Sequence, residues 1–143
     1  MSDFPDDFGM QMFPSYGPFT TASGQTQAVS GDWKTIFTIT GKGQIYGGVL
    51  VFGAPGLSVS SRVRVVIDGV TAFYDTLSGL RNLPPVSPPA TPIYMLYYDT
   101  VGESYTVALA PGITFVTSYA VQFYEVSATL PLINYDVWHT SIA

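Results

Sequence analysis

The stretch RVRVVIDGVTAFY, residues 62–74, decides the fold of this chain. Every second residue from Val63 to Ile67 is apolar, so these side chains lie on one side of a strand. Asp68-Gly69 follows, a dipeptide that adopts the positive φ angles of a tight two-residue turn. The sequence therefore predicts an antiparallel hairpin, with Val70 to Tyr74 as the returning strand.

The period of two continues on the N-terminal side of the hairpin. Residues 33–40 alternate between apolar and polar side chains, and Trp33 falls in the apolar stripe, so we expect it in the core. A further strand is predicted from Gln44 to Phe52. Within it, the pair Gly47-Gly48 indicates a bulge or a close approach of two backbones.

The C-terminal side of the hairpin adds a loop and more strands. Thr76 to Asn82 can form one helical turn. Residues 82–92 hold five of the eleven prolines and predict a stiff surface loop that divides the strands into two sets. The strands expected after it are Ile93 to Tyr98, Tyr105 to Leu109, Ile113 to Thr117 and Tyr119 to Val126. In total, eight or nine short strands predict an all-β fold, an antiparallel β-sandwich or jelly roll with extended N- and C-terminal arms.

Three segments are expected along the chain. Residues 25–127 form the sandwich domain, and residues 128–143 form a C-terminal strand or arm. Residues 1–24 form an N-terminal arm, since prolines exclude a long helix there and the many aromatics are not typical of a solvated tail. The arm either anchors in pockets of a neighbouring subunit or folds back on its own domain. Its candidate partner-binding anchors are Phe4, Phe8, Phe13, Tyr16 and Phe19.

The composition limits the possible functions. Of the 143 residues, 47% are hydrophobic, 15% are aromatic and only 10% are charged, whereas an ordinary soluble domain is about a quarter charged. So few charges leave apolar surface for other subunits, which predicts self-association, with a homotrimer as the expected form. Three of the ten acidic residues are Asp3, Asp6 and Asp7, and the remainder of the chain is nearly neutral. We therefore expect no binding to nucleic acid and no insertion into a membrane.

No sequence motif indicates a catalytic, metal-binding or cofactor-binding site. Without Cys and with one His, His139, the chain lacks a thiol nucleophile and the ligands of a structural zinc site, and no Ser lies in a nucleophile-elbow context, so we expect no enzyme activity, catalytic residue or metal. On a strand, Asp136 and His139 face opposite sides, and a lone His of this kind is typical of a surface or an interface. The glycines of the segment 41–47 are spaced GxGxxxG and precede a strand, so we expect no cofactor.

Aromatic residues outside the predicted core stripes form a second group of candidates. Their place in the core, at a subunit interface or on a ligand-binding surface is open, and a glycan-binding platform is one of the possibilities. These residues are Tyr94, Tyr97, Tyr98 and Trp138.

Residues 31–53, GDWKTIFTITGKGQIYGGVLVFG, and the VRVVIDG hairpin at 63–69 resemble a β-sandwich element of structural proteins of tailed phages. The similar features are a strand that begins with GxW, a TGxG turn, a strand with a GG pair and a hairpin that ends in IDG. The resemblance covers about a third of the chain and includes neither the arm nor the proline-rich loop. It implies a component of the virion, such as a capsid decoration protein, a head-fibre base or a tail protein.

These observations together predict a non-enzymatic structural subunit of a virus particle, assembled in the host cytoplasm. The expected role is that of a capsid decoration (cement) protein, with other copies of itself and other virion proteins such as a major capsid protein as partners. The alternative is a phage tail or fibre module that binds glycans of the host surface.

Overall fold

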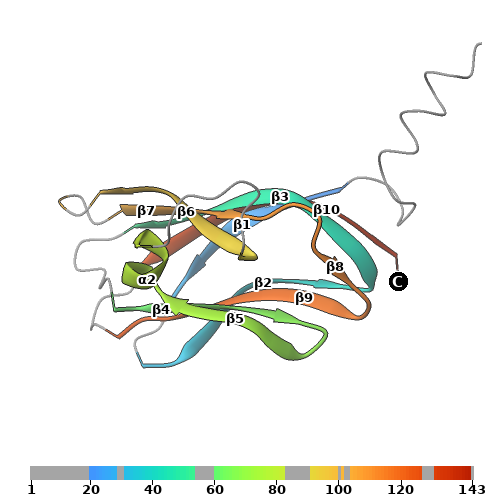
Figure 1. Cartoon of the computed structure of the whole chain (residues 1–143), viewed down its shortest axis with the longest axis horizontal. Helices are drawn as coiled ribbons and strands as arrows, with labels where there is room; N and C mark the ends of the chain where they lie inside the picture. Colours follow the sequence, from blue (N-terminus) through green and yellow to red (C-terminus); the bar gives the residue numbers. More distant parts are fainter. Residues whose placement is uncertain are drawn as a thin grey trace, which may run out of the picture.

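Two antiparallel sheets lie face to face in the computed structural model of the chain (Figure 1). The structure describes residues 20–28, 31–53, 60–82, 91–99, 101, 104–126 and 131–142. In spatial order, sheet A contains β1 (Thr20–Gln27), β10 (Leu132–Ile142), β3 (Lys42–Gly53), β7 (Ser104–Leu109) and β6 (Ile93–Asp99), and β8 (Thr114–Phe115) also pairs with β3. Sheet B contains β2 (Trp33–Thr40), β9 (Ser118–Tyr124), β4 (Arg62–Ile67) and β5 (Val70–Thr76).

The order of the strands is that of a jelly roll. The antiparallel pairs are nested, because β1 pairs with β10, β2 with β9, β3 with β7 and β4 with β5. The pairs are then joined side by side through β10 with β3 and through β9 with β4. The predicted all-β antiparallel sandwich is thus confirmed. The described residues form ten strands, two of which, β6 and β8, are additional to the eight of the nested pairs.

The predicted hairpin is formed by β4 and β5. Asp68 and Gly69 have φ angles of 53° and 81°, as the tight turn requires. The carboxylate of Asp68 also holds a second loop, since it accepts hydrogen bonds from the backbone N–H groups of Val116 (2.9 Å), Thr117 (2.7 Å) and Ser118 (3.1 Å). The N–H groups of Thr117 and Ser118 hold the pKa of Asp68 below its usual value.

Loss of this carboxylate is expected to change the acid stability of the protein. Because the pKa of Asp68 is lowered by folding, its contribution is present above its ordinary pKa of 3.8 and is lost as the pH falls through the folded value. Asp68→Ala should therefore lower the melting temperature at neutral pH and weaken its decline in acid. Asp68→Asn retains an acceptor oxygen without the charge, so it should show a smaller loss at neutral pH. Circular dichroism melts across the acid range test this, and identical acid profiles for wild type and Asp68→Ala would exclude it.

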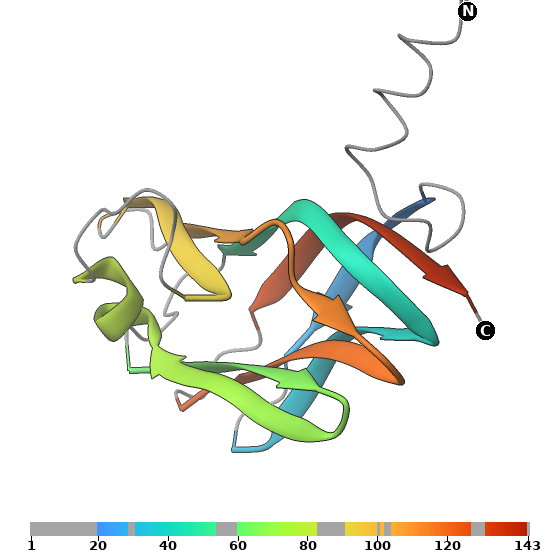
Figure 2. The same cartoon turned by 45° about the vertical axis from the view of Figure 1, so that its right-hand side comes forward.

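The core lies between the sheets and is closed at one end by the short helix α2 (Leu77–Arg81). Phe52 of sheet A and Phe123 of sheet B are fully buried, with ring centroids 4.8 Å apart. Figure 2 shows α2 at the end of the sandwich, where Leu77 and Leu80 are buried. Its N-terminus is capped by the hydroxyl of Thr76, which accepts a hydrogen bond from the N–H of Gly79. The predicted helical turn at 76–82 is confirmed.

The prediction that Trp33 belongs to the core is wrong. The register between β2 and β9 shifts between Thr35 and Phe37, so a β-bulge interrupts the alternation of β2. Phe37 still faces the core, but Trp33 pairs with Tyr124 on the outer face of sheet B. A bulge reverses the facing of every residue that precedes it, and this accounts for the error.

The glycine pair of β3 is both a bulge and a close approach, as predicted. Trp138 pairs with Gly47 and His139 with Ile45, which leaves one extra residue in β3. A Cβ atom added to Gly48 would lie 2.8 Å from the carbonyl oxygen of Asp136. Only glycine permits β3 and β10 to approach so closely at this point.

Both ends of the described chain belong to sheet A. Residues 20–24, which the sequence assigns to the N-terminal arm, form the first part of β1, because their backbone pairs with β10 from Thr20 opposite His139 onward. The C-terminal segment forms the strand β10, which lies inside the sheet with β1 on one side and β3 on the other. The proline-rich loop lies outside the described residues, apart from Asn82, Thr91 and Pro92. No helix in the described ranges has the length and apolar character to span a membrane.

Candidate functional site

The first candidate surface lies along β6, an edge strand of sheet A. We call it the β6 aromatic edge, and it consists of Tyr94, Leu96, Tyr97 and Tyr98. The register with β7 shifts between Met95 and Tyr97, so that Leu96 is the extra residue of a bulge. Leu96, Tyr97 and Tyr98 are 55%, 59% and 47% exposed.

The free side of β6 makes this edge suitable for a partner. Among the described strands, β6 pairs with β7 alone. Sheet A is also poor in charge, since its strands contain one basic residue, Lys42, and two acidic residues, Asp99 and Asp136, besides His139. Edge strands that remain in water are usually protected by charged side chains. The β6 aromatic edge itself contains no charged side chain.

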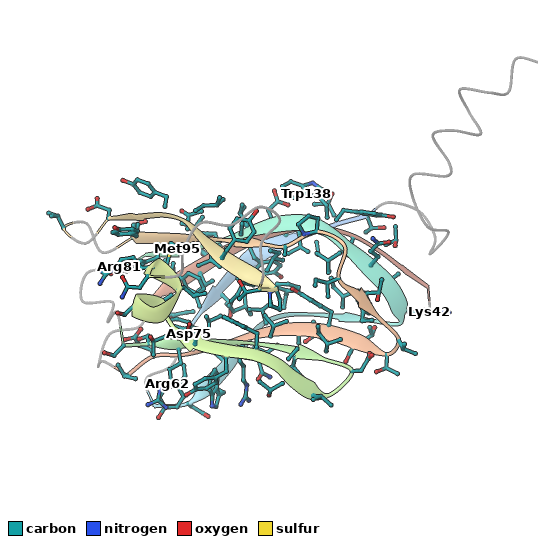
Figure 3. The ribbon with its side chains drawn as sticks, viewed as in Figure 1. Lys42, Arg62, Asp75, Arg81, Met95 and Trp138 are labelled. Atoms are coloured by element: carbon teal, nitrogen blue, oxygen red, sulfur yellow. The ribbon has the colours of Figure 1, made fainter. Side chains whose placement is uncertain are left out.

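The structure does not bring Trp138 together with these tyrosines. Trp138 lies on the outer face of sheet A (Figure 3), on β10, which β3 and β7 separate from β6. Three strand spacings of about 4.8 Å place the two sites about 14 Å apart. Tyr98 differs from its neighbours because the guanidinium group of Arg81 lies 5.4 Å from its ring centroid.

A second surface, which the sequence analysis missed, lies on the outer face of sheet B. We call it the Arg64 cluster, and it consists of Trp33, Tyr74, Tyr124, Arg62, Arg64 and Gln122. Adjacent strands place these residues in two rows. Trp33, Tyr124 and Arg62 are opposite one another in the first row, and Gln122, Arg64 and Tyr74 in the second.

Aromatic rings hold both guanidinium groups of the cluster. The guanidinium carbon of Arg64 lies 3.9 Å from the ring centroid of Trp33, and that of Arg62 lies 5.5 Å from the centroid of Tyr124. The Nε–H of Arg64 donates a 2.6 Å hydrogen bond to Oε1 of Gln122. Gln122 in turn donates from Nε2 to the hydroxyl of Thr35 at 3.1 Å. These contacts fix the orientation of Arg64 in the absence of any ligand.

The charge of the cluster is uncompensated within the described part of the chain. Neither Arg62 nor Arg64 forms an ion pair with a carboxylate there. Arg62 and Arg64 are the charged residues that the strands of sheet B place on this outer face, since Lys34 and Asp75 pair with the buried Phe123 and Val63 and so face the other side of the sheet. Asp75 accepts a hydrogen bond from the N–H of Thr76 at the start of α2. The outer face of sheet B is therefore basic and aromatic, whereas sheet A is nearly uncharged.

The other candidate residues from the sequence are His139 with Asp136, groups that could bind a metal, and the anchors of the N-terminal arm. His139 was expected at a surface or an interface but is only 6% exposed, and burial lowers its pKa. Asp136 does not contact it, since the two side chains alternate across β10. The described residues contain no group of three or more His, Cys, Asp or Glu side chains that could hold a metal ion. The predicted arm anchors Phe4, Phe8, Phe13, Tyr16 and Phe19 lie outside the described residues.

One sequence signal pointed to the Arg64 cluster. Because Val63 and Val65 face the core, Arg62 and Arg64 must face outward on β4. The convergence of Trp33 and Tyr124 on them depends on the bulge in β2 and on the pairing of β2 with β9, which the sequence pattern does not specify. No protein-family model matches the chain, and no curated protein is detectably similar to it in sequence.

Proposed function

We propose that the chain is a non-enzymatic structural subunit of a virus particle, and specifically a capsid decoration protein that bridges neighbouring shell subunits. The observation that carries the proposal is the β6 aromatic edge, an edge strand that pairs only with β7 among the described strands and exposes Leu96, Tyr97 and Tyr98 on a sheet almost without charge. Apolar and aromatic side chains of this kind supply most of the binding energy of protein interfaces. Jelly rolls occur in viral capsid proteins but also in lectins and cupins, so the fold supports the proposal without carrying it.

In this role the β6 aromatic edge faces another virion protein, such as the major capsid protein. Added strands bind a free sheet edge through backbone hydrogen bonds, and side-chain pockets give specificity. The subunit itself is proposed to be a homotrimer. A cyclic trimer joins two different patches of neighbouring copies, which leaves the β6 edge of each copy available for the shell.

The proposal predicts that the chain sediments with particles. Antibody against the purified chain should detect it in the particle band of a density gradient of virions from the organism that carries the gene. Leu96→Asp combined with Tyr97→Asp should weaken binding of added chain to particles by at least about tenfold, because each charge enters an apolar contact. Val70→Asp is the matched control, since Val70 is an exposed residue on an edge strand of sheet B. A chain that stays at the top of the gradient, or β6 variants that bind like wild type, would refute the role.

A glycan-binding module of a phage tail or fibre is the second candidate. It requires exposed aromatic residues beside Asp, Asn or Gln, and the Arg64 cluster provides Gln122 near Tyr74, which is 50% exposed, with the half-buried Trp33 and Tyr124 beside it. A glycan array tests it directly. Binding that is lost in Trp33→Ala, together with no association with particle heads, would favour this candidate over capsid decoration.

A further inference from the structure

The Arg64 cluster offers binding capacity that no described residue uses. Arg64 has five N–H donors, of which the Nε–H is bound to Gln122, and its other N–H groups bond to no residue in the described ranges. Arg62 is exposed and contacts the ring of Tyr124. We propose that this cluster is the docking site for residues 3–8, the segment DFPDDF, of a second copy of the chain. The inference rests on the proposed function in that it names the contact that joins the subunits of the oligomer.

The geometry of the cluster favours carboxylate ligands. A guanidinium group binds a carboxylate through two parallel hydrogen bonds, and such charge-assisted bonds are stronger than neutral ones. Arg64 is already held against Trp33 and by Gln122, so little side-chain entropy is lost when a ligand binds. The surface therefore presents oriented cationic donors with aromatic rings beside them.

The same geometry argues against a neutral sugar as the ligand. Sugars bind aromatic platforms by stacking on a free ring face. In the cluster, Arg64 lies 3.9 Å from the ring centroid of Trp33, and Arg62 lies over the ring of Tyr124. Tyr74 and Tyr124 also contact Trp33, with centroids 5.9 Å and 5.4 Å away. The rings thus act as supports for the guanidinium groups.

The segment 3–8 complements the cluster in charge and in chemistry. Asp3, Asp6 and Asp7 are three acidic residues within five positions, a density found nowhere else in the sequence. Phe4 and Phe8 stand among them and can pack beside Trp33 and the tyrosines. The rest of the chain has five basic residues against seven acidic ones, so this segment carries most of the net charge of −5. Because the two patches carry opposite charges, two Arg64 clusters repel each other, and so do two acidic segments, so that only a segment and a cluster can pair.

The positions of the two patches favour docking between copies. β1 begins opposite His139, at the end of the sandwich where Lys42 lies, whereas Arg62 lies near the other end and on the opposite sheet (Figure 3). The twelve residues from Phe8 to Thr20 span at most about 40 Å when fully extended. To reach its own cluster, the segment would have to follow nearly the whole length of the sandwich and pass around its edge. A neighbour placed head to tail requires no such path, and contacts of this type close into rings such as a trimer.

Charge reversal in the full-length chain tests the proposal. One variant, Arg62→Glu with Arg64→Glu, removes the docking site, and a second, Asp3→Lys with Asp6→Lys and Asp7→Lys, removes the ligand. Sedimentation velocity should show an oligomer for wild type that weakens as salt is raised, and a monomer for each variant alone. An equimolar mixture should associate again with the two variants alternating, because the acidic segment of the first meets the intact cluster of the second and the basic segment of the second meets the acidic cluster of the first. A chain with all five substitutions should associate again. Lys42→Glu with Arg81→Glu, an equal change of charge elsewhere, should associate like wild type.

Several outcomes would overturn the inference. These are a monomeric wild type, a cluster variant that still forms the wild-type oligomer, a mixture that stays monomeric, and an acidic glycan that binds the cluster while the wild type is monomeric. Melting curves show whether Arg64→Glu folds; if it does not, Arg62→Glu alone, at an exposed position, should still weaken association. The test is independent of particle binding. If the chain self-associates as expected but does not sediment with virions, the docking contact is supported and the proposed role in the particle is refuted.

Discussion

Gly43→Ala is expected to lower the free energy of unfolding by about 3 kcal/mol or more. Gly43 lies on β3 between Ser141 of β10 and Phe115 of β8. A Cβ atom at this position would overlap the carbonyl oxygen of Thr140 and would lie 2.9 Å from Cζ of Phe115. The carbonyl belongs to the backbone of a paired strand and Phe115 is buried, so neither can move aside cheaply.

The matched control for this substitution is Gly53→Ala on the same strand. No atom lies within 4 Å of a Cβ at Gly53, so its effect should stay within about 0.5 kcal/mol. Urea titrations followed by circular dichroism provide both values. Equal midpoints for the two variants would show that β3 and β10 do not approach as closely at Gly43 as described.

Phe123→Ala is the second substitution with a large expected effect, a loss of about 3–5 kcal/mol. Phe123 is fully buried on β9, and its ring contacts that of Phe52 across the interface between the two sheets. Truncation leaves a cavity in the middle of the sandwich, where the strands on either side are fixed by their own hydrogen bonds. The same urea titrations measure this loss.

Two further variants calibrate that result. Phe123→Leu keeps most of the volume and should cost less than about 1.5 kcal/mol. Val70→Ala removes methyl groups from a side chain that is 68% exposed, so it should leave the stability nearly unchanged. If Phe123→Ala and Val70→Ala had the same effect, Phe123 would not be a core residue.

The sequence predicts local structure well where one short signal decides it. The Asp68-Gly69 turn, the helical turn after Thr76 and the irregularity at Gly47-Gly48 are each set by a few neighbouring residues, and all three are present. Trp33 shows the limit of this approach. The bulge that turns it outward comes from the pairing of β2 with β9, two strands far apart in the chain, and alternation within β2 cannot reveal it.

The candidate surfaces could be predicted only in part for the same reason. Tyr97 and Tyr98 are exposed on β6, whereas Trp138 lies three strands away, because the order of strands in a sheet does not follow from the spacing of aromatic residues. The Arg64 cluster combines residues from four strands, and its assembly requires every register in sheet B. His139 was expected near the surface, and its burial follows from the position of β10 inside sheet A.

The pairing of β1 with β10 has a mechanical consequence for a subunit held by its N-terminal segment. Tension on that segment enters the domain at Thr20 and acts along the axis of β1. The ladder between β1 and β10 runs from Thr20 opposite His139 to Gln27 opposite Leu132, with its hydrogen bonds perpendicular to this axis. Such a pull loads all of these bonds in shear at once, whereas a sideways pull would open them one after another. Since β10 is itself held by β3, the load passes into the middle of the sheet, and the domain can resist a pull along its N-terminal segment.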